Sequence, residues 1–197
     1  MKKIGPAAGG IYFYTMNMYF IAIVCPPEID EHILAWKMWM KEKYDCQVAL
    51  RSPAHITLVP PFWMRPDLED DLKTSLAKFS TSKSAIGIRL NNFSYFKPRV
   101  IFVDVDQNKM LADLRLALCG FLMSENKFPL EKEDRPFHPH VTIATRDLYK
   151  KSFYDAWDHF KEKKYKAEWT ADGVSLMRHN KKNWEVIITF QLTQTLE

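Results

Sequence analysis

Two four-residue segments of the chain share one pattern, in which a histidine, an apolar residue, a threonine and a second apolar residue follow each other. They are His55-Ile56-Thr57-Leu58 and His140-Val141-Thr142-Ile143. Successive side chains of a strand point to opposite faces, so each histidine shares a face with its threonine while the apolar pair takes the other face. The pattern therefore predicts two strands that are anchored in the core and that each present an imidazole beside a hydroxyl.

Helices and strands are expected to alternate along the rest of the chain. The apolar run at 19–25 predicts a buried strand that stops at Pro26-Pro27, and residues 28–44 follow with apolar side chains at helical spacing. Further helices are expected at 67–80, 108–123 and 148–164, and further strands at 47–51, 55–59, 85–93, 100–105, 140–144, 167–178 and 184–193. Pro60-Pro61 are expected to end the strand at 55–59. This order indicates an α+β (α/β) fold.

The domain organisation follows from the same pattern. The chain contains two similar blocks, each ending in a histidine–threonine strand, which suggests a diverged internal duplication. Because no low-complexity linker separates the blocks, residues 16–197 are expected to form one domain of two pseudo-symmetric lobes. Residues 1–15 are expected to be an N-terminal extension that need not be native.

The composition indicates a globular protein of a reducing compartment. Hydrophobic residues make up 47% of the 197 residues, which is enough for a substantial core. The three cysteines are odd in number and widely spaced, which argues against a disulfide framework or a thiolate zinc site and favours the cytoplasm. Prolines and glycines interrupt the uncharged stretch at 4–27, which argues against a signal peptide or a membrane helix. The net charge of +4 suits an anionic ligand but does not by itself indicate nucleic acid.

The two histidine–threonine strands carry groups suited to acid–base chemistry at a phosphate. An ordinary histidine titrates near pH 6.5, at about the pH of the cell, so one imidazole can act as a general base and the other as a general acid. The two threonine hydroxyls can hydrogen-bond phosphoryl oxygens that lie between them. The alternative is that both segments are structural histidine–threonine pairs with no role in catalysis.

Four segments in this order resemble the two-histidine (2H) phosphoesterase superfamily, whose bacterial and archaeal members are often called 2′-5′ RNA ligases and act as RNA 2′,3′-cyclic phosphodiesterases. The segments read YFIAIVCPP, HITLVPPF, FKPRVIFVDV and RPFHPHVTIA, and the resemblance covers residues 18–191. It implies a bilobal fold in which two antiparallel sheets, with helices outside, flank a central cleft that holds both motifs. It also implies a reaction that needs no metal and no other cofactor.

The resemblance implies a role for each motif residue. His55 matches the histidine usually assigned as proton donor to the leaving 3′ oxygen, and His140 matches the base that activates water. Thr57 and Thr142 match the phosphate-binding hydroxyls, and the product would be a 2′-phosphate. The two histidines could exchange roles on another substrate because the site is nearly symmetric.

Three further residues are candidates for substrate binding. Phe62 and Phe96 fall where family members place aromatic residues near the cleft, and a ring there could stack on a base. Arg146 matches a basic residue that often follows the second motif and could contact a phosphate. The alternatives are core packing for the two phenylalanines and a solvated surface position for the arginine. Arg99 and Arg51 are weaker candidates of the same kind.

The sequence indicates the ligand and the partners of the protein less closely than it indicates the fold. His138-Pro139-His140 raises a metal site, but no third ligand stands at a telling spacing, so no metal is expected. The expected partners are RNA 3′ ends or small nucleotides that bear a cyclic phosphate, bound by a monomer away from membranes. Val59-Pro60-Pro61-Phe62 replaces the lysine-phenylalanine-leucine-glycine run of the branch named for RNA ligases, which leaves the substrate open. Rival functions are a phosphodiesterase for 2′-5′-linked oligonucleotides and a binding module for AMP-like nucleotides without turnover.

Overall fold

The computed structural model describes residues 15–132 and 134–193, so the expected extension at 1–15 lies outside the described residues except for Thr15. The helices are α1 (Pro27–Tyr44), α2 (Glu69–Ser80), α3 (Lys109–Ser124) and α4 (Phe153–Phe160). The strands are β1 (Asn17–Val24), β2 (His55–Met64), β3 (Ile86–Phe96), β4 (Val100–Val105), β5 (His140–Ala144), β6 (Lys166–Ala171), β7 (Gly173–His179) and β8 (Trp184–Gln191). Three short 3-10 helices complete these elements: η1 (Val48–Arg51), η2 (Pro66–Leu68) and η3 (Lys150–Ser152). No helix of the described residues is long and apolar enough to cross a membrane.

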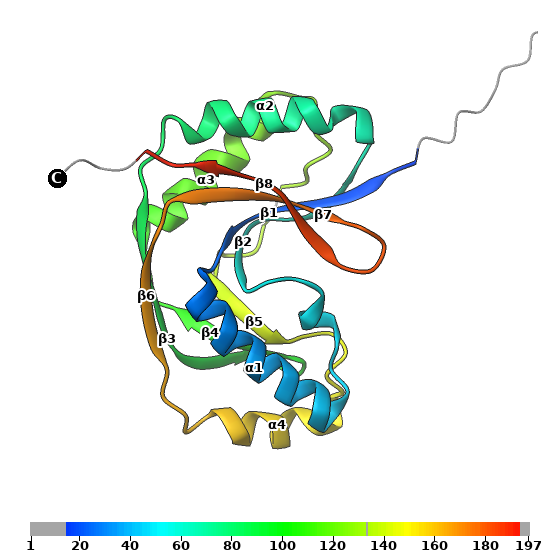
Figure 1. Ribbon diagram of the computed structural model, residues 1–197, viewed down its shortest axis with the longest axis vertical. Helices are drawn as coiled ribbons and strands as arrows, with labels where there is room; N and C mark the ends of the chain where they lie inside the picture. The colour runs from blue at the N-terminus through cyan, green and yellow to red at the C-terminus, as the bar shows by residue number, and fades with distance from the viewer. Residues whose placement is uncertain (1–14, 133, 194–197) are drawn as a thin grey trace, which may run out of the picture.

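The described strands form one curled sheet of eight, in the order β6-β3-β4-β5-β2-β1-β7-β8, and each neighbouring pair is antiparallel (Figure 1). The sheet divides into two halves of four strands. Among the named strands of the described residues, the halves pair only through β5 and β2, where Ile56 and Val141 are the paired positions. A further bridge joins Ser84 to Thr193, beyond the ends of β3 and β8. The expected α+β fold is confirmed, with its two antiparallel sheets joined edge to edge through this short seam.

The two halves of the sheet are related by a pseudo-two-fold arrangement of the chain. The order β1-α1-β2-α2-β3 is followed by the matching order β4-α3-β5-α4 and the C-terminal strands. β3, the strand after α2, crosses to the other half and pairs with β4. β6, the strand after α4, stays beside β3, and the chain crosses back at β7, which pairs with β1. Each half of the sheet is therefore built from both halves of the chain.

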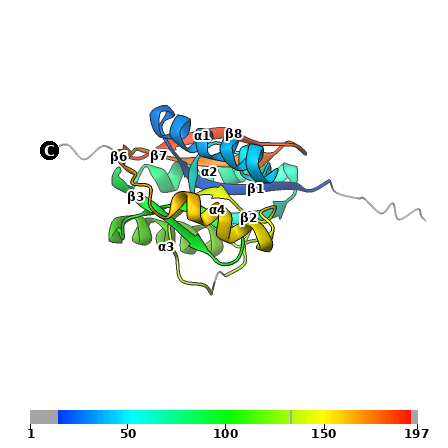
Figure 2. The same cartoon turned by 90° about the horizontal axis from the view of Figure 1, so that it is seen from below.

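The helices cover the sheet in two pairs at opposite ends of the molecule (Figure 1). α1 packs against β5 and lies beside α4, where the Trp39 ring stacks on His159 with 3.6 Å between ring centroids (Figure 2). α2 packs on β7 and β8, and α3 packs on β2. α1, which precedes the motif strand β2, thus rests on the half of the sheet that holds β5. α3, which precedes the motif strand β5, rests on the half that holds β2. These contacts connect the two halves of the sheet.

Buried apolar side chains explain why residues 27–44 form a helix against the sheet. Ile29, Ile33 and Met40 recur at helical spacing and are buried, and Pro27 occupies the first turn, where its missing N–H costs nothing. Asp45 ends the helix in the left-handed conformation, with φ of 55°. Lys37 lies on the same buried face and is only 3% exposed, which is unusual for a lysine.

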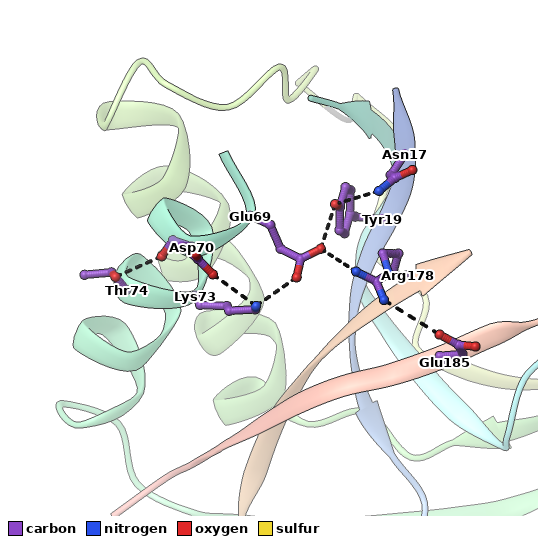
Figure 3. Close-up of polar contacts among 8 residues, drawn as sticks. All are labelled: Asn17, Tyr19, Glu69, Asp70, Lys73, Thr74, Arg178 and Glu185. Carbon is purple, nitrogen blue, oxygen red and sulfur yellow. Dashed lines mark hydrogen bonds and ion pairs between the residues drawn. The ribbon is translucent and has the colours of Figure 1, made fainter. Parts of the chain in front are cut away.

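A half-buried carboxylate joins α2 to the sheet. Glu69, on the first turn of α2, accepts hydrogen bonds from the Tyr19 hydroxyl of β1 at 2.8 Å and from Arg178 of β7 at 2.9 Å (Figure 3). Lys73, one turn along the helix, lies 2.8 Å from its second oxygen. These three partners explain why the pKa of Glu69 is lowered although burial alone would raise it.

The structure corrects the expected end of the strand that carries the first motif. β2 continues through Pro60-Pro61 to Met64 instead of ending at the prolines. The pairing of β1 with β2 shifts there, since Tyr19 pairs with Phe62 and Ile21 pairs with Val59. The two prolines therefore occupy a bulge, where a strand tolerates residues that cannot donate to the ladder.

Other expected element boundaries were also wrong. Residues 48–51 form the 3-10 helix η1 instead of a strand, because the Asp147 carboxylate accepts from the backbone nitrogens of Gln47 and Val48 at 2.6 and 2.7 Å. The expected strand at 167–178 is divided into β6 and β7, which pair with different halves of the sheet. The expected helix at 148–164 consists of η3 and the shorter α4.

Candidate active site

The seam between the two halves of the sheet brings the two motif strands together. Ile56 of β2 and Val141 of β5 are paired across the antiparallel seam, and both are fully buried. The residues on either side of this pair point to the opposite face and share it. These four partly buried residues are His55, Thr57, His140 and Thr142. Each histidine consequently lies across the seam from the threonine of the other strand, and we call these four side chains the HxT face.

The His55 ring is oriented by the backbone that precedes it. Its Nδ1 lies 2.8 Å from the Pro53 carbonyl oxygen, and its ring centroid lies 4.8 Å from that of Phe20. Burial lowers the pKa of His55 to about 4, and the nearby charge of Lys37 adds to the lowering, while the Pro53 carbonyl opposes it. The neutral ring is therefore the stable form in the ligand-free protein.

Two charged side chains of α1 hold the segment that leads into His55. The Lys37 ammonium donates to the Ser52 carbonyl oxygen at 3.0 Å, and the Asp30 carboxylate accepts from the Ala54 nitrogen at 2.6 Å. Burial lowers the pKa of Lys37 to about 8, and the Asp30 carboxylate opposes this lowering. The two hydrogen bonds fix the backbone on both sides of the carbonyl that orients His55.

The His140 ring is held in a matching way. Its Nδ1 lies 2.7 Å from the His138 carbonyl oxygen, and the His138 ring is itself held by the Asp104 carboxylate, with 2.9 Å between Nε2 and Oδ1. The rings of Phe96 and Phe102 lie against His140, with centroid distances of 5.2 and 4.8 Å. Burial is the main cause that lowers the pKa of His140, and the charge of His138 adds to it.

These contacts determine which nitrogen of each ring is available for chemistry. A carbonyl oxygen can only accept, so Nδ1 of His55 and of His140 carries the proton in the neutral ring. Nε2 is then the atom that takes up or delivers a proton. Since both pKa values are lowered, an anion bound between the rings is needed to favour a protonated imidazole.

A cavity of about 550 Å³ opens beside the HxT face. Thr57, His140 and Thr142 line it, together with Phe96, and two arginines, Arg115 and Arg135, complete its polar lining. Among the described residues that line it, no side chain is a carboxylate. Its size suits a nucleotide and its charge suits an anion. A larger hollow of about 740 Å³ lies at the β3–β6 edge, away from both motifs.

The further binding residues expected from the sequence occupy three different settings. Phe96 lines the cavity and meets the His140 ring edge to face, at an angle of 89°. Phe62 is 8% exposed and packs in the core against Tyr19, at 6.2 Å between centroids, outside the cavity lining. Arg146 is exposed and also lies outside the lining, and its carbonyl oxygen accepts a hydrogen bond from Arg99 at 3.4 Å.

Three cavity residues were missed by the sequence reasoning. Arg135 and Phe137 belong to the segment just before the second motif, and their closeness to His140 in the chain is a signal that could have found them. Arg115 reaches the cavity from α3, and its position in a helix distant from both motifs carries no such signal.

His138 and His140 are the two histidines that raised a metal site in the sequence. Their ring centroids are 6.3 Å apart, and the His138 ring is paired with Asp104. The described part of the chain contains no group of three or more histidine, cysteine, aspartate or glutamate side chains placed to hold a metal ion.

Two half-sheets thus meet at paired HxT strands, with two helices on each half. The model of the 2′-5′ RNA ligase superfamily matches residues 25–183, and the chain belongs to this family of two-histidine phosphoesterases. Among curated proteins, no sequence matches the chain.

Solved structures show the same fold at low sequence identity. E. coli LigT complexed with 3′-AMP is 19% identical to this chain with a TM-score of 0.68, and the match covers 91% of this chain and 100% of that one. TT0787 of Thermus thermophilus is 20% identical with a TM-score of 0.64, again over 91% of this chain and 100% of that one. E. coli LigT complexed with ATP gives 20% identity, a TM-score of 0.64 and the same coverage.

Proposed function

We propose that this protein is a metal-independent phosphodiesterase that hydrolyses the 2′,3′-cyclic phosphate of RNA ends or nucleotides to a 2′-phosphate. The observation that carries the proposal is the pairing of the two HxT strands at the seam. It sets two imidazoles and two hydroxyls on one face, beside a cavity without carboxylates among the described residues that line it. General acid, general base and phosphate ligands are the groups that opening a cyclic phosphate requires.

The proposed reaction uses each member of the HxT face once. The hydroxyls of Thr57 and Thr142 donate to the phosphoryl oxygens and hold the phosphorus between the two rings. Nε2 of His140 takes a proton from water as the water oxygen bonds to phosphorus. His55 delivers a proton from Nε2 to the 3′ oxygen as the bond between phosphorus and that oxygen breaks. The near symmetry of the site also permits the two histidines to exchange roles.

The lowered pKa values fit a site that charges only when substrate is bound. Burial disfavours an imidazolium at either position, but a bound phosphate brings a negative charge that favours one. The proton donor is therefore created by the substrate. Such coupling protects the ligand-free core from a buried positive charge.

The solved relatives are consistent with a nucleotide ligand. E. coli LigT has been crystallised with 3′-AMP, with ATP and with NADP+. We infer the same class of ligand for the cavity beside His140, in a protein that acts as a monomer on cyclic-phosphate ends.

The test is hydrolysis of the four nucleoside 2′,3′-cyclic monophosphates and of a short RNA with a cyclic-phosphate end, in the presence of EDTA. Wild type is compared with His55→Ala and His140→Ala, and with His32→Ala, an exposed histidine outside the site, as the control. We expect a 2′-phosphate product and a loss of about 100-fold or more for each motif variant, as removal of a general acid or base produces.

Other outcomes separate the rival functions. Nucleotide binding without turnover by the wild type would replace the enzyme with a binding module. Cleavage of 2′-5′-linked oligonucleotides in preference to cyclic phosphates would redirect the substrate while keeping both histidines. Equal activity of wild type and both motif variants would contradict the mechanism.

A further inference from the structure

Arg115 is a half-buried arginine that the proposed reaction does not use. It extends from α3 into the cavity beside the HxT face, and its guanidinium carbon lies 4.8 Å from the centroid of the Phe137 ring. No carboxylate within the described stretches of the chain forms an ion pair with it. Arg178, which is also partly buried, is by contrast paired with Glu69 and Glu185. A partly buried cation without a counter-ion is costly and favours binding of an anion.

The charge of the cavity supports the same conclusion. Its described lining combines two arginines and two histidines with threonine hydroxyls. The neighbouring hollow holds Asp104 and Asp106, and it shares only Phe137 and His138 with the cavity. Asp104 and Asp106 therefore lie in the neighbouring hollow, while the described lining of the cavity contains two arginines and no carboxylate.

The geometry of the guanidinium favours a phosphate over a base. The Phe137 ring lies 4.8 Å from the guanidinium carbon, and this contact helps to hold the side chain in the cavity lining. The planar N–H fork of a guanidinium matches two oxygens of a phosphate. Thr57 and Thr142 already serve the cyclic phosphate in the proposed reaction, so Arg115 is available for a different group of the substrate.

We propose that Arg115 binds a second phosphate of the substrate, the one attached to the 5′ oxygen of the terminal nucleoside. The inference rests on the proposed function and narrows its substrate class to RNA 3′ ends and 5′-phosphorylated nucleotides, in preference to plain nucleoside cyclic phosphates. A cavity of about 550 Å³ has room for a nucleotide with both phosphates.

Binding of product analogues tests the inference without requiring turnover. The two probes are adenosine 2′-phosphate and adenosine 2′,5′-bisphosphate, measured by calorimetry at one ionic strength. We expect wild type to bind the bisphosphate about 10- to 100-fold more tightly, the range for hydrogen bonds to a charged group. Arg115→Gln should lose this preference while its affinity for the monophosphate stays within about twofold, and Arg115→Lys should keep part of it.

Arg89→Gln is the matched control, because Arg89 is an exposed arginine that lies outside the cavity and faces Glu168. It should retain the full preference for the bisphosphate. A wild type with equal affinity for both probes would overturn the inference. So would an Arg115→Gln variant that keeps the preference or that loses affinity equally for both probes.

Kinetics then distinguish the two sources of the second phosphate. Adenosine 2′,3′-cyclic phosphate is compared with its 5′-phosphorylated form and with a dinucleotide that ends in a cyclic phosphate. A kcat/KM advantage for either phosphorylated substrate that disappears in Arg115→Gln supports the inference, and the larger advantage identifies the source. If no substrate is turned over, the proposed hydrolysis fails, but the binding preference still decides the role of Arg115.

Discussion

The two motif histidines are partly buried by the contacts that orient their rings. Burial lowers the pKa of both, to about 4 for His55, while each Nδ1 is held by a carbonyl oxygen two residues earlier in the chain. Both rings are therefore neutral in the ligand-free protein at neutral pH. This property gives two expectations for pH dependence, one for activity and one for stability.

The kcat/KM of the enzyme is expected to be highest in mildly acidic solution, because this quantity reports the titrating groups of the free enzyme. The reaction needs one protonated and one neutral histidine, and both pKa values lie below the ordinary value of 6.5. kcat/KM should then pass through its maximum below about pH 6.5 and fall about tenfold per pH unit on the alkaline side. A profile of kcat/KM from pH 4 to 9 measures this. A plateau that extends to pH 8 would contradict it.

Protonation of His55 is expected to destabilise the fold. The pKa is about 4 in the folded protein and 6.5 as the ordinary value, so between these pH values the unfolded chain binds more protons. The free energy of unfolding should therefore fall as the pH is lowered from about 6.5 to about 4. In His55→Gln the fall should be smaller. Urea unfolding at pH 7 and pH 4.5 compares wild type with His55→Gln, and His32→Gln is the surface control. An equal fall in the free energy of unfolding between the two pH values in all three proteins would exclude this role of His55.

At the scale of elements, α1 positions the first motif through two charged side chains, one buried and one half-buried. Lys37 and Asp30 hold the backbone on either side of Pro53, whose carbonyl oxygen orients the His55 ring. The helix is thereby connected to the start of β2 by polar contacts, in addition to its apolar packing on β5. Lys37 acts on the site only through His55 and is a positioning residue.

Replacement of Lys37 by methionine is expected to raise the pKa of His55, because the nearby ammonium is one of the causes that lower it. The loss of the hydrogen bond to Ser52 should also lower kcat by about tenfold, since orientation of the ring is weakened. NMR titration of the His55 ring and steady-state kinetics measure the two effects. Lys41→Met, an exposed lysine one turn further along α1, is the control and should change neither. An unchanged His55 titration in Lys37→Met would contradict the positioning role.

The attachment of α2 to the sheet depends on the charge of Glu69. Glu69→Gln keeps the shape of the side chain but leaves Arg178 and Lys73 without their common partner (Figure 3). We expect it to lower the free energy of unfolding by about 1–3 kcal/mol, the cost of disrupting a partly buried charged network. Asp70→Asn, which removes a carboxylate that is 94% exposed on the same turn, should cost less than about 0.5 kcal/mol. Urea unfolding of both variants tests this difference, and equal effects would contradict it.

At the scale of the whole molecule, the two halves of the sheet share one core. The main cluster of buried side chains includes Ile21 of β1 and Ile101 of β4, which belong to different halves. The crossing strands and the helices that rest on the opposite half add further connections. We therefore expect that the pseudo-symmetric halves do not fold independently of each other.

We accordingly expect the protein to unfold in one cooperative transition. Tryptophan fluorescence and far-ultraviolet circular dichroism should give coincident urea curves, because neither half retains its packing without the other. Two separated transitions, or probes that disagree in midpoint, would show that the halves unfold independently. The proposed monomeric state can be tested on the same samples by light scattering.

Much of the fold could be predicted because the relevant patterns are local. The alternation in the two motifs predicts their strands and shows which side chains face the core, and the four main helices follow from apolar spacing. Local patterns were insufficient at 48–51, where a distant carboxylate from Asp147 holds a 3-10 helix. They were also insufficient at Pro60-Pro61, where the pairing with β1 accommodates a bulge.

The paired motifs, the alternation of strands and helices, and the resemblance to a two-histidine family could be recognised in the amino-acid sequence, since they depend on residues close together in the chain. Tertiary packing, in contrast, buries Phe62 in the core, leaves Arg146 exposed to solvent and brings Arg115 to the cavity. It also decided that Lys37 of α1 holds the segment before His55. The physical reason is that these placements depend on which distant segments pack together, and backbone preferences within a single segment carry no information about that packing.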